Sequence, residues 1–462
     1  MTRREWLSLV AFSSAVLLPA SCGGDDEDGE QATRMEPSPR AADIVETAKE
    51  PRQYTLAYLE HPYFYNPPKP SILGREVVNG WNSGSILGAP DEATLDFIDI
   101  PRILDESNRF QGALSVIEYL NTTAAGGVAA ADVVWLPSYA QIMDILRAKF
   151  FAPLDRWLQG DKQTPLEAFS DEVIRLVRYK GQTLGLPIAV APGILGYDAI
   201  SFQRANVAAP ATEWTWSEFI EAGQRLTLDA NEDGKPEQWG LSANWDFPDW
   251  LPFLLQEGGE IVDLDSGVIR LEGPAAIHAL TAWDEMGREY GIYPYGTEVT
   301  DADLRGYEDV VPSAMRFSRF NKHPWGYWPD YASMPQGSKK ATPLLLEEVL
   351  AVPAAAAADD AYAALIPLAH WIGERRVLPA VTSGWQFLEK PDTGHFDLIF
   401  PEAMRQTALE SLPHAKASQA ASSSQISYHL FYQVTLPLAR GEVVVEQAID
   451  RAVIWLQSYL AE

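Results

Sequence analysis

Short apolar runs alternate with stretches of helical periodicity from Tyr54 to the end of the chain. Three runs predict strands, at residues 54–59, 95–100 and 132–136, and the third is almost continuously apolar, as in a strand buried on both faces of a parallel sheet. Helical spacing lies between and after them, at 110–120 and 142–158. This alternation predicts an α/β fold with crossover helices, and 462 residues are enough for two domains.

The same pattern continues in the second half of the chain. Thr215-Trp-Ser-Glu218 has the sequence of a capping box, which predicts that a helix begins there with Trp216 facing inward. Pro274 suits the first turn of a second helix, which would turn Trp283 toward the core. Further helices are expected at 361–371 and 443–460.

Composition and motifs limit the functions that this chain can have. There are 64 acidic and 35 basic residues, which give a net charge of -29, and this argues against a nucleic-acid partner because phosphate binding needs a cationic surface. There is no His-Glu-x-x-His pair and no Gly-Lys-Ser/Thr phosphate loop. An enzyme is therefore not expected, although catalytic groups that converge from distant segments leave no such motif.

The first fifty residues predict export and membrane attachment. Residues 1–21 read as a signal peptide with Arg3 and Arg4 before an apolar stretch, and either the general or the twin-arginine route is compatible with them. Cys22, the only cysteine, follows Leu-Pro-Ala-Ser and resembles the lipidated cysteine of a bacterial lipobox. Residues 22–50 are polar and predict a disordered tether. We expect an extracytoplasmic lipoprotein, held at a membrane in the periplasm or at the cell surface.

Several motifs stand in an order that resembles one known family. They are Ala131–Leu136, Tyr179–Pro187, Ile188–Val190, Ile194–Asp198, Glu213–Phe219, Glu257–Ile261 and Ser313–Met315. In this order they resemble the extracellular solute-binding protein family 1, the sugar-binding receptors of ABC transporters.

The resemblance implies a two-lobed periplasmic-binding-protein-like fold (type II), with the lobes joined by hinge strands. One lobe would comprise residues 51–190 and 346–400, and the other 191–345 and 401–462. The two lobes would close on a solute like a hinge. The implied function is to bind a mono- or oligosaccharide without altering it and to deliver it, as a monomer, to an ABC permease.

Aromatic residues placed near the ends of strands are candidates for stacking on a sugar. Ser138 and Tyr139 follow the run at 132–136 directly. The other candidates are Trp245, Trp250, Trp325 and Trp328. For each aromatic residue, packing in the core is the alternative. Arg319 lies in a basic cluster with Arg316, Lys322 and His323 that would contact an anionic group of the solute or form surface salt bridges.

One acidic loop has the spacing of a calcium site. Asp229, Asn231 and Asp233 stand at positions one, three and five, with Gly234 at six. The Lys235 carbonyl and Glu237, at position nine, would be further ligands. Position twelve is Gly240, so the bidentate Glu that is usual there is missing and would have to come from elsewhere. The alternative is a turn rich in Asp and Asn. No other cofactor is expected.

Two further functions stay open at this stage. The chain would also fit a receptor for a non-sugar solute, such as a polyamine or an organic anion. An extracellular glycan-active enzyme would need a pair of carboxylates, and the candidates for it are Asp246, Asp249 and Glu257.

Overall fold

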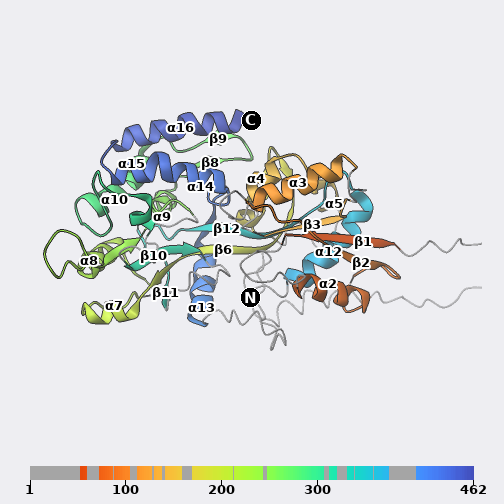
Figure 1. Ribbon diagram of the computed structural model, residues 1–462, viewed down its shortest axis with the longest axis horizontal. Coiled ribbons are helices and arrows are strands. Elements are labelled where there is room, and N and C mark those ends of the chain that lie inside the picture. The colour runs from red at the N-terminus through yellow and green to blue at the C-terminus, as the bar shows by residue number, and fades with distance from the viewer. Residues whose placement is uncertain are drawn as a thin grey trace, which may run out of the picture. The chain divides into compact units, whose positions relative to one another are not determined.

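One mixed sheet forms the centre of the fold in the computed structural model (Figure 1). The structure describes residues 52–59, 72–86, 88–104, 112–126, 130–137, 141–158, 169–211, 213–242, 247–305, 312–319, 330–337, 339–356, 358–373 and 402–461. Within these residues the strands follow the order β2-β1-β3-β12-β6-β10-β7, with β11 beside β6 and β13 beside β12. Their bounds are β1 Gln53–Tyr58, β2 Thr94–Asp99, β3 Val133–Pro137, β6 Leu186–Tyr197, β7 Trp239–Ser242, β10 Ser313–Arg319, β11 Asp330–Ala332, β12 Thr342–Ala351 and β13 Ala415–Ala417.

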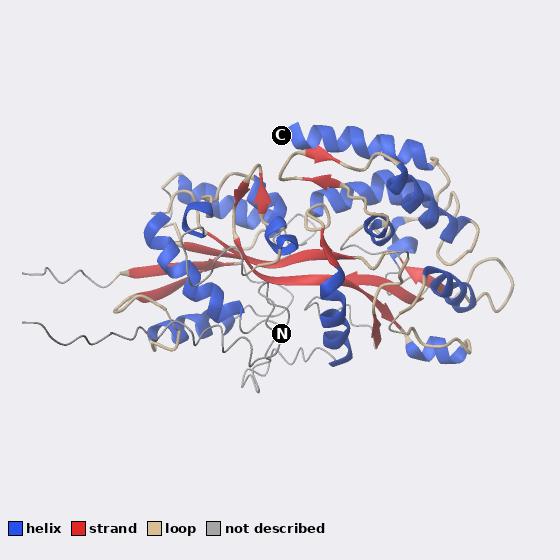
Figure 2. Cartoon of the chain, turned by 180° about the vertical axis from the view of Figure 1, so that it is seen from behind, coloured by secondary structure: helices blue, strands red, loops and turns tan. Residues whose placement is uncertain are grey.

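Helices cover both faces of this sheet (Figure 2). They are α2 Ile72–Asn82, α3 Gly112–Ala124, α4 Ile142–Arg147, α5 Asp155–Leu158, α6 Asp171–Arg175, α7 Ala199–Arg204, α8 Trp216–Leu226, α9 Leu251–Gln256, α10 Pro274–Arg288, α11 Asp301–Arg305, α12 Ala358–Gly373, α13 Glu402–Ser411, α14 Ser424–Leu430, α15 Leu436–Ala439 and α16 Val445–Ala461. A 3-10 turn, Leu412–His414, follows α13, and a π-helical turn, Phe431–Thr435, joins α14 to α15. Among the described residues no helix is both long and apolar enough to cross a membrane.

Two long strands, β6 and β12, connect the two ends of the sheet. The first part of β6 and most of β12 pair antiparallel, from Leu186↔Leu350 to Pro192↔Leu344. On the side away from β6, β12 pairs antiparallel with β3. Beyond β3, the strands β1 and β2 continue the sheet in parallel. The last part of β6 pairs instead with β10 and β11. The fold is therefore a two-lobed α/β structure in which the lobes share two crossing strands, as the sequence predicts.

Two hairpins lie outside the main sheet. One pairs β4 (Arg178–Tyr179) with β5 (Gln182–Thr183), within the predicted hairpin that precedes β6. The other pairs β8 (Val262–Asp263) with β9 (Val268–Ile269), between α9 and α10.

Two helices, α8 and α10, begin where their local signals predict. The Thr215 side chain accepts from the Glu218 amide, and the Glu218 carboxylate accepts from the Thr215 amide, so the capping box is formed. Pro274 is the first residue of α10, and Trp283 is buried on its inner face.

The helix predicted at 142–158 is wrong in one respect, because the chain breaks into α4 and α5. Between them Phe151 bridges to Pro353 and the Ala152 amide donates to the Val352 carbonyl. The break therefore ties this segment to the chain that follows β12.

Candidate functional site

Most of the predicted solute-binding residues follow described strands in the sequence. Ser138 and Tyr139 follow β3, Trp245 follows β7, and Trp325 and Trp328 follow β10; these five residues lie outside the described part of the chain. Arg319 is the last residue of β10, and the structure describes its backbone but not its side chain. What the structure establishes is therefore the positions of the strand ends that carry these residues.

The ends of β3 and β10 converge on one stretch of the crossing strands. Pro137, the end of β3, pairs with Glu348 of β12, which in turn pairs with Ala189 of β6. Arg319, the end of β10, pairs with Gly193. The registers show that β3 runs in the direction of β6 and that β10 runs against it, so the two strands run toward each other.

The two ends face each other across the crossing strands. Four residues of β6 separate Ala189 from Gly193, roughly 13 Å along the strands, and three strand spacings of about 4.8 Å separate β3 from β10, so the two ends are roughly 20 Å apart. A gap of this size leaves room for a solute that is held by loops from both lobes. The sequence could not show this convergence, because it depends on pairing between segments about 150 residues apart.

A pair of carboxylates lies in this stretch, and the sequence analysis did not single it out. Leu346 pairs with Val190 and Glu348 with Ala189, so Glu347 is an extra residue in β12 and forms a β-bulge. Glu348 is 9% exposed and Glu347 is half-buried. Bulges re-aim side chains and are frequent beside functional sites. The available signal was the Glu-Glu pair inside an otherwise apolar strand.

Close packing of the crossing strands depends on Gly193. A Cβ at this position would lie 2.9 Å from Thr342 Oγ1 and 3.0 Å from Pro343 Cδ. The Thr342 hydroxyl donates to the Gly193 carbonyl at 2.7 Å. Because any side chain at Gly193 would push β12 away, this glycine fixes the spacing of the strands where β10 ends.

Trp250 lies in the core of the structure. Its side chain is fully buried, and its indole N–H donates to Thr435 Oγ1 at 3.3 Å. Thr435 ends the π-helical turn that joins α14 to α15. In this conformation the Trp250 ring has no exposed face, so the structure places it with the core residues and not with the strand ends.

The carboxylates considered for glycan cleavage do not form a visible pair. Asp246 lies outside the described residues. Asp249 is buried just before α9, and Glu257 caps the other end of that helix. The two residues therefore stand at opposite ends of α9, eight residues apart in the sequence.

The acidic loop at 229–237 makes its hydrogen bonds within itself. Asp229 accepts from the amides of Asp233 and Gly234, at 3.1 and 2.9 Å. Asn231 accepts from the Asp233 amide, and Asp233 from the Lys235 amide. Glu237 accepts from the Ala230 amide. Within the described residues there is no group of three or more His, Cys, Asp or Glu side chains arranged to hold a metal ion.

Solved structures share the two-lobed fold over nearly the whole chain. An ABC substrate-binding protein from Listeria monocytogenes, solved with cycloalternan, is 16% identical, and the match covers 89% of this chain and 99% of that one at a TM-score of 0.60. The cyclic alpha-maltosyl-1,6-maltose binding protein from Arthrobacter globiformis is 17% identical, with 89% and 99% covered and a TM-score of 0.63. UgpB from Mycobacterium tuberculosis, solved with glycerophosphocholine, is 16% identical, with 90% and 99% covered and a TM-score of 0.56.

The fold and the converging strand ends define a two-lobed binding protein of the periplasmic type. A family model described as bacterial extracellular solute-binding protein matches residues 115–372, which is more than half of the 462 residues. The chain belongs to this family of bacterial extracellular solute-binding proteins. A search of curated proteins finds no match.

Proposed function

We propose that this chain is the substrate-binding lipoprotein of an ABC importer and that its solute is a mono- or oligosaccharide. The observation that supports the proposal is the convergence of β3 and β10, because the candidate residues of both lobes follow these two strand ends in the sequence. Solute contacts on both lobes make closure favourable, whereas a solute that touched one lobe alone would not shift the equilibrium between open and closed forms. The protein would release the solute unaltered to a permease.

The chemistry at the strand ends suits a sugar. Tyr139 from one lobe and Trp325 and Trp328 from the other would supply flat faces for the apolar C–H surface of a sugar ring. Glu347 and Glu348, which lie in the β12 bulge, would accept hydrogen bonds from hydroxyl groups. Similar folds bind oligosaccharides in the Listeria and Arthrobacter proteins.

An anionic solute is the second candidate. Arg319 ends β10 at the convergence point, and Arg316 precedes it on the same strand. A guanidinium group can donate two parallel hydrogen bonds to two oxygens of one carboxylate or phosphate group. A similar fold holds glycerophosphocholine in the Mycobacterium protein. A polyamine would instead favour the carboxylates of the bulge.

Binding is tested by intrinsic fluorescence with a panel of neutral sugars, acidic sugars, glycerophosphodiesters and polyamines. We expect a neutral sugar to change the emission, and Trp325→Ala and Tyr139→Ala to weaken its binding by roughly 1–3 kcal/mol, the loss typical of a buried aromatic contact. Trp455→Ala is the matched control, because this indole stacks on His429 in the C-terminal helices. A response to polyamines or anions alone would replace the sugar as the solute class. Full affinity in both Trp325→Ala and Tyr139→Ala would refute the site.

A further inference from the structure

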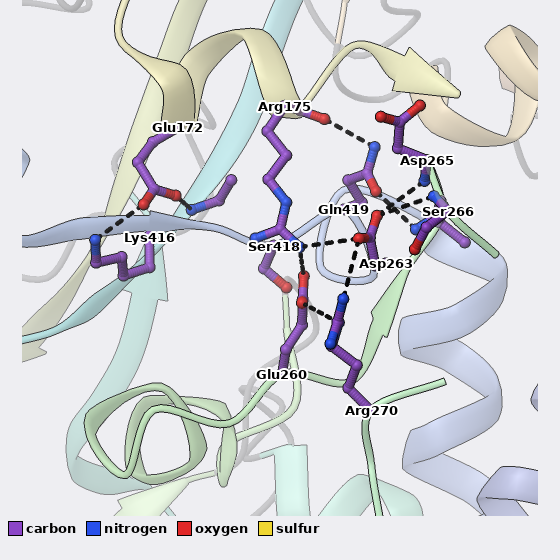
Figure 3. Close-up of polar contacts among 12 residues, drawn as sticks. Glu172, Arg175, Glu260, Asp263, Asp265, Ser266, Arg270, Lys416, Ser418 and Gln419 are labelled. Atoms are coloured by element: carbon purple, nitrogen blue, oxygen red, sulfur yellow. Dashed lines mark hydrogen bonds and ion pairs between the residues drawn. The ribbon is translucent and has the colours of Figure 1, made fainter. Parts of the chain in front are cut away.

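A cluster of polar contacts joins segments that belong to the two lobes (Figure 3). On one side are α6 and the β4–β5 hairpin. The hairpin is fixed to the first lobe, because Thr183 donates through its amide and its hydroxyl to the Asp155 carboxylate, each at 2.9 Å, and the Leu154 amide donates to the Thr183 carbonyl. On the other side are Glu260, the β8–β9 hairpin and Arg270, which lie between α9 and α10 of the second lobe.

Two guanidinium groups share two carboxylates at the centre of this cluster. Arg175 of α6 donates to Glu260 and lies 3.8 Å from Asp263. Arg270, from the same lobe as the carboxylates, lies 3.3 Å from Glu260 and 3.6 Å from Asp263. The Glu260 and Asp263 side chains are only 15% and 14% exposed. Arg175 is thus a charge from the first lobe that balances two poorly hydrated carboxylates of the second.

The environment of Glu260 shows how much the pair depends on Arg175. Burial raises the pKa of Glu260, and the nearby Asp263 raises it further, while Arg175 and Arg270 act in the opposite direction. If the lobes separate here, Arg175 moves away from Glu260 and Asp263. Arg270, whose side chain is half exposed, is then the remaining cation of the cluster beside these two carboxylates. Separation therefore has an electrostatic cost.

A buried amide ties the same segments together by hydrogen bonds. The Gln419 side chain is 1% exposed and donates to the carbonyls of Arg175 and Arg178, at 2.8 and 2.6 Å. Its oxygen accepts from the Leu264 amide at 2.8 Å. One side chain therefore bridges the backbones of α6, the β4–β5 hairpin and the β8–β9 hairpin, and any movement between them leaves buried polar groups unpaired.

Two outer contacts complete the cluster. The Glu172 carboxylate accepts from Lys416 Nζ at 2.9 Å and from the Ala417 amide at 2.7 Å, and both donors belong to β13. Asp265 accepts from the Gly181 amide at 2.6 Å and lies 3.4 Å from Arg178 Nε.

We propose that these residues form a latch between the lobes, centred on Arg175 and Gln419, which stabilises the arrangement of the lobes seen in this structure. The latch is joined to the crossing strands through β13, which pairs with the start of β12. Its free energy is then part of the equilibrium that a solute must shift in order to bind. The expected effect of the latch on solute binding rests on the proposed function. Its expected effect on the arrangement of the lobes is independent of that function.

The latch is tested by the distance between the lobes in the absence of any solute. Spin labels are attached to Leu114→Cys on α3 and Ile200→Cys on α7, which replace exposed side chains, in a Cys22→Ala background that has no other cysteine. Arg175→Gln and Gln419→Leu are expected to shift or broaden the distance distribution measured by pulsed electron resonance. Arg288→Gln is the matched control, because Arg288 pairs only with Asp284 and Glu289 near the end of α10 among the contacts that the structure describes.

High salt and a second variant weaken the same ion pairs in two further ways. One molar NaCl should move the wild-type distribution in the same direction as Arg175→Gln does, because ion pairs that are partly exposed are screened. Glu260→Gln, which keeps the shape of the side chain, should give the same shift if Arg175→Gln folds poorly. Distributions of folded Arg175→Gln and Glu260→Gln that match the wild type would overturn the latch.

The solute panel separates this result from the proposed function. With a solute identified, the shifted population should change the apparent Kd about three- to tenfold in Arg175→Gln, with no change at the solute site. A panel without any response would refute the proposed function and leave the distance measurement unaffected. An unchanged distance with normal solute binding would refute only the latch.

Discussion

Asp144 is a buried acid whose ionisation affects stability. It lies on α4 and accepts from Ser423 Oγ at 2.6 Å, from Tyr459 OH at 2.9 Å and from the Gln425 amide at 3.3 Å. Burial raises the pKa of Asp144 above its ordinary value of 3.8, although these hydrogen bonds and the charge of Arg147 act against the rise. The folded protein therefore holds this proton more tightly than the unfolded chain does. The contribution of Asp144 to stability is greatest in acid and is lost as the pH rises from 3.8 through the raised pKa.

Asp144→Asn should remove this part of the pH dependence. In thermal unfolding between about pH 3.5 and 7, we expect the difference in free energy of unfolding between the variant and the wild type to move in favour of the variant as the pH rises. Asp91→Asn, at an exposed aspartate, is the control and should leave the profile parallel to that of the wild type. A constant difference between Asp144→Asn and wild type over the whole range would contradict the assignment.

Substitutions at Trp250 can distinguish a role in core packing from a role in solute binding. Because the ring is fully buried, Trp250→Ala should lower the free energy of unfolding by about 3–5 kcal/mol, measured in urea. Trp250→Phe keeps most of the volume but loses the hydrogen bond to Thr435, so it should cost less. We expect the solute affinity of folded Trp250→Phe to equal that of the wild type. A loss of affinity without a loss of stability would return Trp250 to the solute site.

At the scale of elements, local signals were enough for α8, which begins at a capping box, for α10, which begins at a proline, and for β1, β2 and β3. They were not enough for β6, where the sequence indicated only a crossing at 188–190. The strand in fact runs from Leu186 to Tyr197, although Pro187, Pro192 and Gly193 interrupt its pattern. Its length is set by pairing with β12 and β10, and such distant pairing leaves no local signal. The bulge at Glu347 depends on the same pairing, and its one local signal is the Glu-Glu pair in an otherwise apolar run.

Residues that follow strands could be predicted as site candidates, because the ends of strands in α/β folds carry ligand-binding loops. Trp250 shows the limit of that rule. It follows β7 at a distance of eight residues, but the local sequence does not reveal that Thr435, far along the chain, lies against it. The burial of an aromatic residue depends on what packs over it.

The acidic loop at 229–237 is an element whose role calorimetry can decide. We propose that it is a turn stabilised by its own hydrogen bonds, because position twelve of the calcium spacing is Gly240, which lies in β7 and packs against Gly223 of α8. Titration of metal-stripped protein with millimolar calcium should then give no heat and no change in melting temperature. Asp229→Asn should behave like the wild type in both measurements. Heat that is saturable and absent in Asp229→Asn would establish a calcium site instead.

At the scale of the whole molecule, the proposed lipid anchor and tether would keep the binding lobes near a membrane. A tether of about 29 residues with the properties of a random coil would have a root-mean-square span of roughly 30 Å. This length would let the lobes turn and close while they stay within reach of a permease. The net charge of -29 would also repel the protein from the anionic surface of a bilayer, so attachment would depend on the acyl chains alone.

Lipidation at Cys22 is therefore the condition on which this arrangement depends. Each buried methylene contributes about 0.8 kcal/mol, and because one acyl chain binds only marginally, several chains on the same cysteine are needed for stable attachment. In a bacterial host that processes lipoproteins, the wild-type protein should fractionate with membranes and carry the added lipid mass at Cys22. Cys22→Ala should appear in the soluble fraction with the lobes folded and the solute affinity unchanged, since no described residue of the site lies near that end of the sequence. Ser21→Ala, which keeps a small residue before the cysteine, is the matched control and should stay with the membrane. A wild-type protein that is as soluble as Cys22→Ala and has no added mass would refute the lipid anchor.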